Sequence, residues 1–321
     1  MLAPAHKIAD LQTEMQIGFI KQQFLRHLSE ALHLHQVFAP LFVSADSGIN
    51  DDLNGTERPV SFSNSGKDFT VVHSLAKWKR LRLAELSMPC HQGIVTHMIA
   101  LRPDEQLSPM HAVLVDQWDW EVVIRPEDRH PAFLQATVLK IYKALRLTCA
   151  ALQEAYPGMR SLDLPEQPAF IHSEALRARY PQQDAKARED LVTREHGAVF
   201  LQGIGHPLSD GQLHDDRAPD YDDWSTETTP GYHGLNGDLL VWHPVLQRSV
   251  ELSSMGIRVN APALREQLHL RGLQQREQLP FHQKLLAGEL PDTIGGGIGQ
   301  SRLALLLLQL QDIKAVQYTY N

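Results

Sequence analysis

The segment Thr293-Ile-Gly-Gly-Gly-Ile-Gly-Gln-Ser-Arg302 leads directly into an apolar run, Leu303-Ala-Leu-Leu-Leu-Leu308. Glycine has no side chain, so a strand made largely of it lets another group approach its backbone closely, and it also permits positive φ. The helix predicted after the strand presents free N–H groups and the positive end of its dipole to an anion. Arg302, in the first turn of that helix, suits a phosphate or the face of an aromatic ring. The segment therefore predicts a strand and a helix beside a phosphate-bearing ligand, with a plain packing turn as the alternative.

Two common glycine-rich motifs do not match this segment. A dinucleotide-binding fingerprint that begins at Gly295 requires glycine at position 300, which is occupied by Gln300. A P-loop requires Gly-Lys-Ser or Gly-Lys-Thr, and neither follows the glycines. What remains is a glycine-rich strand that places Arg302 at the start of a helix.

The composition is that of an ordinary globular protein, with 43% apolar and 21% charged residues among 321. Thirty basic and 38 acidic residues give a formal charge of −8, which disfavours a broad nucleic-acid surface. The sequence has no long apolar run and no signal-peptide pattern, so we expect no membrane contact and a cytoplasmic location. The two cysteines, Cys90 and Cys149, are too few for a disulfide framework and are expected to be packing residues.

The N-terminal segment, residues 5–45, predicts a helix followed by an edge strand. Apolar residues recur every three or four positions from Ala5 to about Leu34, as in a long amphipathic helix. The stretch from Gln36 to Ser44 is rich in β-forming residues but contains Pro40, which is tolerated mainly at a sheet edge. This segment suits a dimer interface, and equally a helix that packs on its own domain.

An antiparallel hairpin is predicted from the strands Ile94–Arg102 and His111–Glu121, with a loop of about eight residues between them. Gln117 and Asp119 are two residues apart in the second strand, so they share one face of it. A carboxylate and an amide beside two tryptophans either decorate a surface or line a polar pocket in a sheet.

A second antiparallel pair is predicted at Gly237–Leu246 and Val250–Val259. Asp238 and Glu251 lie near opposite ends of these strands, where their carboxylates can face each other as a magnesium site requires. The remaining periodic segments predict helices at 131–156, 184–196, 263–273 and 281–288 and strands at 59–63, 69–73 and 197–203. The chain, residues 1–321, therefore predicts one α+β domain with an antiparallel β-sheet flanked by helices.

Two polar loops are candidates for function. Asp46 to Gly55 is a turn with three aspartates, among them Asp51, and such residues either act at a site or simply form a solvated turn. The long irregular stretch from Gly205 to Asn236 is expected to be functional or disordered. Its histidines fit no standard metal-ligand spacing, so we expect them to be solvated loop residues: His206, His214 and His233.

Eight blocks of sequence, in order along almost the whole chain, resemble those of ammonia-dependent asparagine synthetase, also called aspartate–ammonia ligase. The blocks are Asn50-Asp51, His73–Arg80, Ala100–Asp104, Val115–Trp120, Ala218–Ser225, Leu235–Asp238, Glu251–Arg258 and Gly295–Arg302. That family is similar in fold to the catalytic domain of class II aminoacyl-tRNA synthetases. The resemblance implies an antiparallel sheet flanked by helices and a homodimer formed through the first helix and strand.

The resemblance also implies a reaction. ATP and L-aspartate form a β-aspartyl-AMP intermediate with release of pyrophosphate, and ammonia then displaces AMP to give L-asparagine. The implied partners are L-aspartate, ammonia, ATP and Mg²⁺, with no nucleic acid. Glutamine-dependent enzymes of this kind use an N-terminal cysteine, whereas this chain begins Met1-Leu2, so free ammonia is the expected nitrogen donor. Its ending, Gln317 to Asn321, differs from the longer tail expected of the family.

The same resemblance assigns residues to roles. For ATP the expected residues are Arg102, Met110, Val115, Asp238, Gly297 and Arg302, and for magnesium Asp238 and Glu251. For aspartate they are Ser74, Lys79, Gln117, Asp119, Asp222, Ser254 and Arg258. The expected catalytic residues are Asp51, Lys79, Arg102 and Gln117, with Asp51 as the carboxylate that captures ammonium and takes its proton.

Two rival interpretations remain at this stage. A tRNA-dependent paralogue of an aspartyl- or asparaginyl-tRNA synthetase would make a similar adenylate, but it would need a basic surface and further chain for RNA. A regulatory paralogue that only senses amino acids would be expected to lack Arg102 or Arg302, and both are present.

Overall fold

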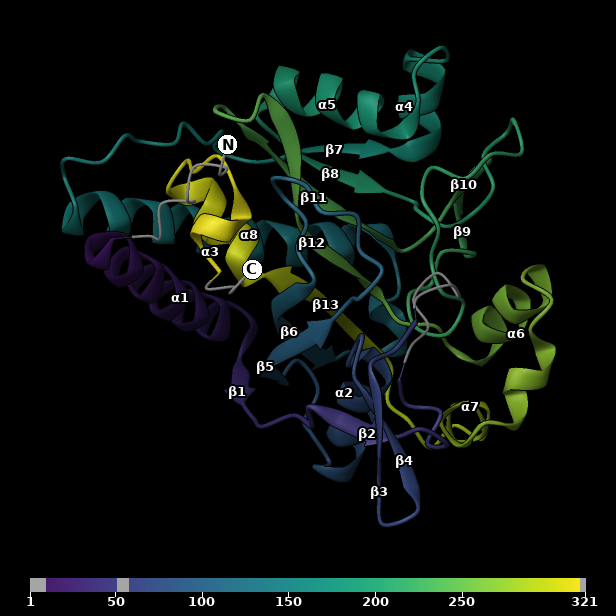
Figure 1. Ribbon diagram of the computed structural model, residues 1–321. Coiled ribbons are helices and arrows are strands. Elements are labelled where there is room, and N and C mark those ends of the chain that lie inside the picture. Colours follow the sequence, from purple (N-terminus) through teal and green to yellow (C-terminus); the bar gives the residue numbers. More distant parts are fainter. Residues whose placement is uncertain (1–9, 51–57, 318–321) are drawn as a thin grey trace, which may run out of the picture.

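The glycine-rich strand β13 (Thr293–Gly299) lies inside an eight-stranded sheet, between two strands that carry five of the predicted site residues. A computed structural model describes residues 10–50 and 58–317. Across the sheet the strands are ordered β1 (Leu34–Gln36), β5 (Gly93–Leu101), β6 (Leu114–Val123), β13, β12 (Arg248–Ile257), β11 (Asn236–His243), β8 (Ala198–Gln202) and β7 (Ala169–His172). Figure 1 shows this sheet running through the middle of the molecule.

The expected antiparallel sheet is corrected to a mixed one. Within the series β5-β6-β13-β12-β11-β8, each strand is antiparallel to the next. The two edge strands differ, because β1 is parallel to β5 and β7 is parallel to β8. Parallel neighbours need a long crossover connection instead of a hairpin. At one edge the crossover contains helix α2 (Ala76–Glu85), and at the other it contains α4 (Ser173–Arg179) and α5 (Ala185–His196).

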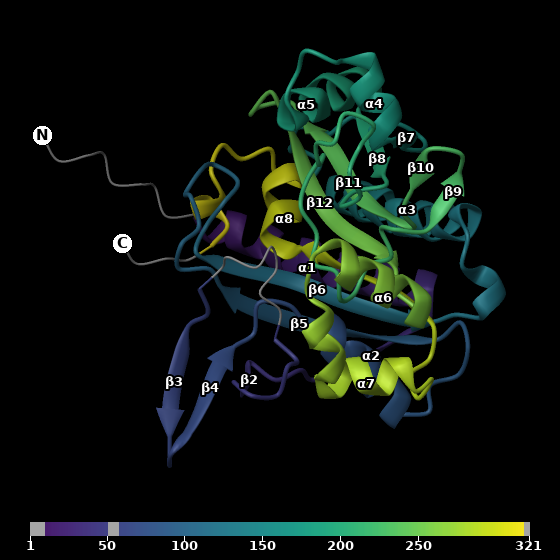
Figure 2. The ribbon, with the colours of Figure 1, turned by 90° about the vertical axis from the view of Figure 1, so that its right-hand side faces the viewer.

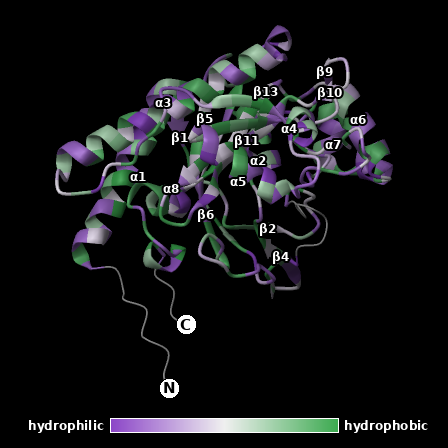
Figure 3. Ribbon diagram, turned by 90° about the horizontal axis from the view of Figure 1, so that it is seen from above, coloured by the Kyte–Doolittle hydropathy of each residue, from purple (hydrophilic) through white to green (hydrophobic). Residues whose placement is uncertain are grey.

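Two long helices, α1 (Leu11–Leu32) and α3 (Pro131–Ala155), pack together over one face of the sheet (Figures 1 and 2). Phe24 of α1 lies with its ring centroid 4.9 Å from that of Trp118 on β6, and both side chains are buried. The apolar face of α1 therefore packs on its own chain, which was one of the two alternatives that the sequence left open for this helix. Figure 3 shows helices that alternate between hydrophobic and hydrophilic turns around mainly hydrophobic central strands.

The remaining helices lie around the sheet. They are α6 (Ala261–Leu270), α7 (Pro280–Leu286), α8 (Gln300–Leu307) and the 3₁₀ segments Pro126–Asp128, Gln274–Gln278 and Ile313–Ala315. Two small sheets complete the fold: β2 (Phe42–Ser44), β4 (Lys67–Val71) and β3 (Ser61–Asn64) form one, and β9 (Glu227–Thr229) and β10 (Tyr232–His233) form the other. Figure 2 shows β3 and β4 projecting from the body of the molecule. Every helix in the described ranges is too short or too polar to cross a lipid bilayer.

The single strand expected from Gln36 to Ser44 is two separate strands. β1 ends at Gln36 and joins the large sheet, and β2 begins at Phe42 and joins a small one. Pro40, which cannot donate a ladder hydrogen bond, lies in the break between them. Strand β7 and helix α4 were not predicted at all, because each is too short to show a clear period.

The glycines of β13 make room for side chains of the neighbouring strand. A Cβ atom at Gly295 would overlap the carboxylate of Glu121, and one at Gly297 would overlap the side-chain oxygen of Gln117. At Gly296 it would lie 2.6 Å from Cβ of Met255 on β12. The described β13 glycines do not adopt positive φ, so backbone conformation does not explain why glycine occupies these positions. The close approach of other groups, which the sequence predicted, does explain it.

Candidate active site

A polar cavity of about 430 Å³ lies over β6, β13 and β12 and contains most of the residues predicted to form the site. The predicted residues that line it are Ser74, Arg102, Met110, Val115, Gln117, Asp119, Asp222, Glu251, Ser254, Arg258, Gly297 and Arg302. A second cavity of about 560 Å³ shares part of its wall, including Arg102, Glu251 and Arg302. The fold thus gathers residues from six of the eight sequence blocks around one space.

Strand β6 faces the hydrophobic core with one side and the cavity with the other. Trp118 and Trp120 are fully buried in the core. The residues that alternate with them along the strand point to the opposite face. Gln117 and Asp119 line the cavity, so they form a polar pocket and not a surface decoration. The same period of two continues to Glu121, which was not predicted as a site residue.

Lys79 lies behind the cavity wall and is not one of its lining residues. Its ammonium donates to Asp119 Oδ1 at 2.5 Å and to the carbonyls of Trp120 and Gly296 at 3.1 Å each, and the side chain is 1% exposed. An ammonium has three N–H donors, and these contacts use all of them. Lys79, one of the residues expected to bind aspartate, thus contacts Asp119 and two backbone carbonyls in this structure.

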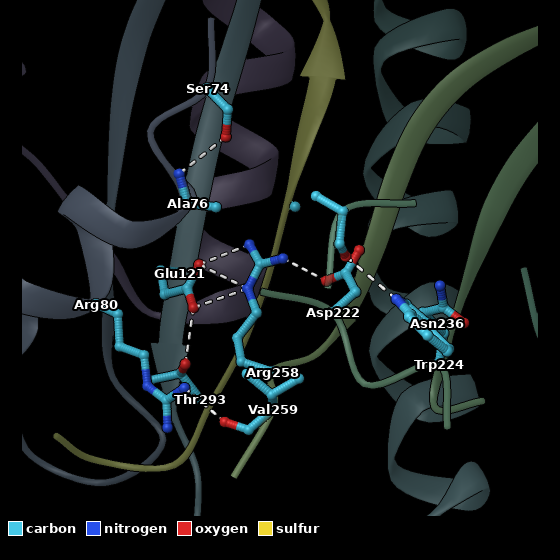
Figure 4. Close-up of polar contacts among 12 residues, drawn as sticks. Ser74, Ala76, Arg80, Glu121, Asp222, Trp224, Asn236, Arg258, Val259 and Thr293 are labelled. Carbon is cyan, nitrogen blue, oxygen red and sulfur yellow. Dashed lines mark hydrogen bonds and ion pairs between the residues drawn. The ribbon is translucent and has the colours of Figure 1, made fainter. Parts of the chain in front are cut away.

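Arg258 is clamped between two carboxylates in the wall of the cavity (Figure 4). Its guanidinium donates to Glu121 at 2.8 and 2.9 Å, and from its other side to Asp222. Thr293 Oγ1 donates to the same Glu121 at 2.7 Å. Burial opposes ionisation of Glu121, but Arg258 and Lys79 outweigh it and lower its pKa. Burial raises the pKa of Asp222 despite the nearby guanidinium of Arg258.

Arg302 projects from the first turn of α8, as the sequence predicted. Its guanidinium donates to the carbonyl of Glu251 at 3.0 Å, and it lies 3.7 Å from the Glu251 carboxylate. The N-cap of α8 is Gly299, which has no side chain to cap the helix. The missing cap comes from β6, where Asp116 Oδ1 accepts the Ser301 N–H at 3.0 Å. The other predicted arginine, Arg102, lies 3.6 Å from Glu105.

Asp238 and Glu251 lie on paired strands and influence each other electrostatically. Burial, together with repulsion from Glu251 and Asp215, raises the pKa of Asp238 to about 6 against the attraction of Arg217. One carboxylate oxygen of Asp238 accepts from Arg217 at 2.5 Å, while Oδ1 has no hydrogen-bond partner in the described structure although it is buried. The unpaired oxygen of Asp238 and the carboxylate of Glu251 on the adjacent strand are oxygen ligands of the kind that Mg²⁺ prefers.

Asp51 lies outside the described residues. Its neighbour Asn50 is described: the Asn50 side chain accepts the His73 N–H at 2.7 Å, and His73 lines the cavity beside Ser74. The polar turn is therefore tied to the site on its N-terminal side.

The irregular stretch from Gly205 to Asn236 is largely ordered, and part of it lines the cavity. Trp224 is buried, and its backbone N–H donates to Gln267 at 2.8 Å. The histidines do not form a metal site: the rings of His206 and His233 are stacked with centroids 3.9 Å apart, and His214 contacts Glu189 at 3.0 Å. His214 is buried, so for this residue the expectation of a solvated side chain is wrong.

Some residues in the cavity wall, and Glu121 behind it, were missed in the sequence. Glu121 had a usable signal, because it continues the period of Gln117 and Asp119 along β6. Arg217 and Lys186 had none, because one lies in an irregular loop and the other in a helix far along the chain.

Residues 11–321 match the model of the aspartate-ammonia ligase family. The fold is similar to that of the asparaginyl-tRNA synthetase of Pyrococcus horikoshii complexed with asparaginyl-adenylate, with a TM-score of 0.71 and 14% identity over 95% of this chain and 68% of that one. It is also similar to the asparaginyl-tRNA synthetase of Entamoeba histolytica in complex with asparaginyl-adenylate (TM-score 0.66, 15% identity, 95% and 66% of the two chains). The aspartyl-tRNA synthetase of Entamoeba histolytica is also similar in fold, with a TM-score of 0.63 and 13% identity over 95% of this chain and 58% of that one.

The likeness to synthetases, at such low identity, concerns the fold alone, and it confirms the predicted class II architecture. The match to the family model covers nearly the whole chain and confirms the family that the sequence blocks indicated. The chain belongs to the aspartate-ammonia ligase family, and it is an ATP-dependent ligase that forms L-asparagine from L-aspartate and ammonia.

Proposed function

We propose that the cavity holds L-aspartate at its inner part and ATP toward the second cavity, and that both half-reactions occur there. The observation that carries this orientation is the distribution of charge. Asp119 and Asp222 line only the first cavity, whereas Arg102 and Arg302 line both. Phosphates bind arginines and an α-ammonium binds carboxylates, so the two substrates meet where the first cavity adjoins the second.

In the first half-reaction, a β-carboxylate oxygen of aspartate attacks the α-phosphorus of ATP. A new P–O bond forms, the bond from the α-phosphorus to the bridging oxygen breaks, and pyrophosphate leaves with the electron pair. Arg102 donates to the α-phosphate and the attacking carboxylate, and Arg302 stacks on adenine and reaches the outer phosphates. Each charge-assisted hydrogen bond contributes about 1.5 to 3 kcal/mol, and donors already in place need no reorganisation.

Aspartate is recognised by the inner residues of the cavity. Asp119 and Asp222 receive the α-ammonium, and Lys79 holds Asp119 in position from behind. Arg258 uses three of its five N–H groups on Glu121 and Asp222, which leaves two for a substrate carboxylate. The other polar groups proposed to contact aspartate are Ser74, Gln117 and Ser254.

Met110, Val115 and Gly297 line the cavity and are proposed to contact the nucleotide. Asp238 and Glu251 are proposed to hold Mg²⁺, with Arg217 keeping Asp238 oriented. A cation held there would supply positive charge that lowers the repulsion between the phosphates and the incoming carboxylate.

In the second half-reaction, ammonia attacks the β-carbonyl of the adenylate and AMP leaves. Asp51 is proposed to capture ammonium and take its proton, which is worth roughly 10²- to 10⁴-fold in rate. Asp51→Asn should retain aspartate-dependent release of pyrophosphate and lose asparagine formation. Equal loss of both would contradict this division of labour.

One assay tests the reaction and its rivals together. The protein is incubated with ATP, L-aspartate, Mg²⁺ and ammonium, with and without tRNA, and asparagine and AMP are measured. We expect equimolar asparagine and AMP in both arms. Asparagine that forms only with tRNA would favour an RNA-dependent paralogue, and neither product in either arm would favour an amino-acid sensor.

We also propose a homodimer formed through α1 and the strands that follow it. Several large apolar side chains there are exposed, among them Leu11 at 73%, Met15 at 60% and Phe38 at 98%. A subunit interface on this segment would remove these apolar side chains from water. The proposed compartment is the cytoplasm, where ATP is plentiful, and the net charge of −8 supports the absence of a nucleic-acid partner.

A further inference from the structure

The second cavity is lined by five cations that belong to five different ion pairs. They are Arg58, Arg102, Lys186, Arg248 and Arg302. Their carboxylate partners are Asp104, Glu105, Glu189, Asp190 and Glu251. Three of these pairs are too long for hydrogen bonds between the side chains: Arg102 with Glu105 at 3.6 Å, Arg302 with Glu251 at 3.7 Å and Arg248 with Asp190 at 3.8 Å. The cavity wall therefore has N–H donors available to an anion.

Lys186 is the lysine that lines both cavities, beside Arg302 and Glu251. It occupies the first turn of α5, where a positive charge opposes the helix dipole. Its side chain is 63% exposed, so packing does not explain the position. A lysine in this unfavourable but accessible place is suited to an external anion.

Buried groups hold the Lys186 ammonium in place. Lys186 Nζ lies 3.1 Å from Glu189 Oε2, and the other oxygen of Glu189 contacts His214 Nε2 at 3.0 Å. Glu189 and His214 are both buried, so the carboxylate has a fixed position. Although the side chain is exposed, the protein groups around its ammonium partly desolvate it and lower the pKa of Lys186, but Glu189, Glu251 and Asp215 outweigh this and raise the pKa above its ordinary value. Lys186 is therefore a fixed cation at neutral pH.

We propose that the second cavity is the pyrophosphate site of this enzyme and that Lys186 binds the outer phosphate. This rests on the orientation of ATP proposed above, in which the phosphate chain points away from Asp119 and Asp222. When the α-phosphorus is attacked, the β- and γ-phosphates leave together as pyrophosphate, with the bridging oxygen keeping the electron pair of the broken bond. Lys186 then neutralises part of the charge on the leaving group, and the open cavity gives pyrophosphate a way out that does not cross the adenylate.

The test is direct binding of pyrophosphate with Mg²⁺, measured by isothermal titration calorimetry, beside binding of AMP. In Lys186→Met we expect pyrophosphate to bind roughly ten- to a hundredfold more weakly and AMP to bind within twofold of wild type. Lys186→Arg should recover most of the pyrophosphate affinity. Lys140→Met, on the exposed side of α3, is the matched control and should bind both ligands as wild type does.

A second measurement uses the unaltered protein and so does not depend on folding of a variant. Pyrophosphate with Mg²⁺ should protect Lys186, and not Lys140, from acylation by an amine-reactive reagent, read by mass spectrometry of peptides. Unchanged pyrophosphate affinity in Lys186→Met, an equal loss of AMP affinity, or no protection of Lys186 would overturn the proposal. Neither measurement needs asparagine formation, so failure of the proposed reaction and failure of this site are separate results.

Discussion

Gly297→Ala tests whether the glycines of β13 exist to leave room for the side chains of β6. The added methyl group would overlap the side-chain oxygen of Gln117, which is the free end of a flexible side chain. Gln117 can rotate away, so the fold should survive. We expect an unchanged or slightly higher melting temperature, because glycine in a strand interior costs about 0.5 to 1 kcal/mol relative to alanine.

The cost should appear in activity. If Gln117 donates or accepts one hydrogen bond to a charged group in the transition state, its displacement removes about 1.5 to 3 kcal/mol. That corresponds to a fall of roughly ten- to a hundredfold in kcat/KM for aspartate, since about 1.4 kcal/mol is a factor of ten. The assay is ammonium-dependent asparagine formation with aspartate varied and ATP saturating.

A double-mutant cycle separates this explanation from a simpler one. In a Gln117→Ala background there is no side chain to displace, so Gly297→Ala should cost less than threefold. Gly158→Ala is the control, because an added Cβ there meets no atom within 4 Å. If Gly297→Ala costs as much in the Gln117→Ala background as in wild type, the methyl group blocks the ligand itself and our reasoning is wrong.

Three further predictions address stability and assembly. Arg258→Lys should lower the free energy of unfolding by about 3 kcal/mol, measured in urea, because lysine cannot bridge Glu121 and Asp222 together; unchanged stability would contradict the clamp. Burial works against ionisation of Asp220, but its contact with His282 and the charges of Lys77 and Arg276 lower its pKa well below the ordinary value. The folded state then binds fewer protons than the unfolded state, so this stabilisation is present above the ordinary carboxyl pKa, near 4, and is lost as pH falls below it. Asp220→Asn should flatten the acid side of the pH–stability curve, and a curve as steep as that of wild type would count against the assignment. Phe38→Asp should shift the protein from dimer to monomer in sedimentation velocity; an unchanged sedimentation coefficient would move the interface elsewhere.

The site could be predicted from the sequence to the extent that each residue carried a local signal. The alternation along β6 placed Gln117 and Asp119 on one face, and the glycine run located the strand that lies against them. Both signals are short-range, because they depend only on the two-residue repeat of a strand and on the absence of a side chain. The same reasoning, continued two residues further, would have found Glu121.

Other features were invisible locally. Arg258 and Glu121 are 137 positions apart, and Lys79 and Gly296 are 217 apart, so no periodicity brings them together. Lys79 was expected at the aspartate site, and only the packing of α2 behind β6 revealed that its ammonium contacts Asp119 and the carbonyl of Trp120 inside the wall. Whether a charged side chain faces a ligand or an internal partner depends on what covers it, and only the tertiary structure contains that information.

The sequence by itself determined the family, the order of most strands and helices, and part of the polar lining of the cavity, because these follow from local patterns repeated along the chain. The tertiary structure decided which strands are neighbours, that the sheet edges are parallel, and which charges are paired internally. Those outcomes depend on many weak contacts between distant segments. Their sum, and not any single stretch of sequence, selects one arrangement.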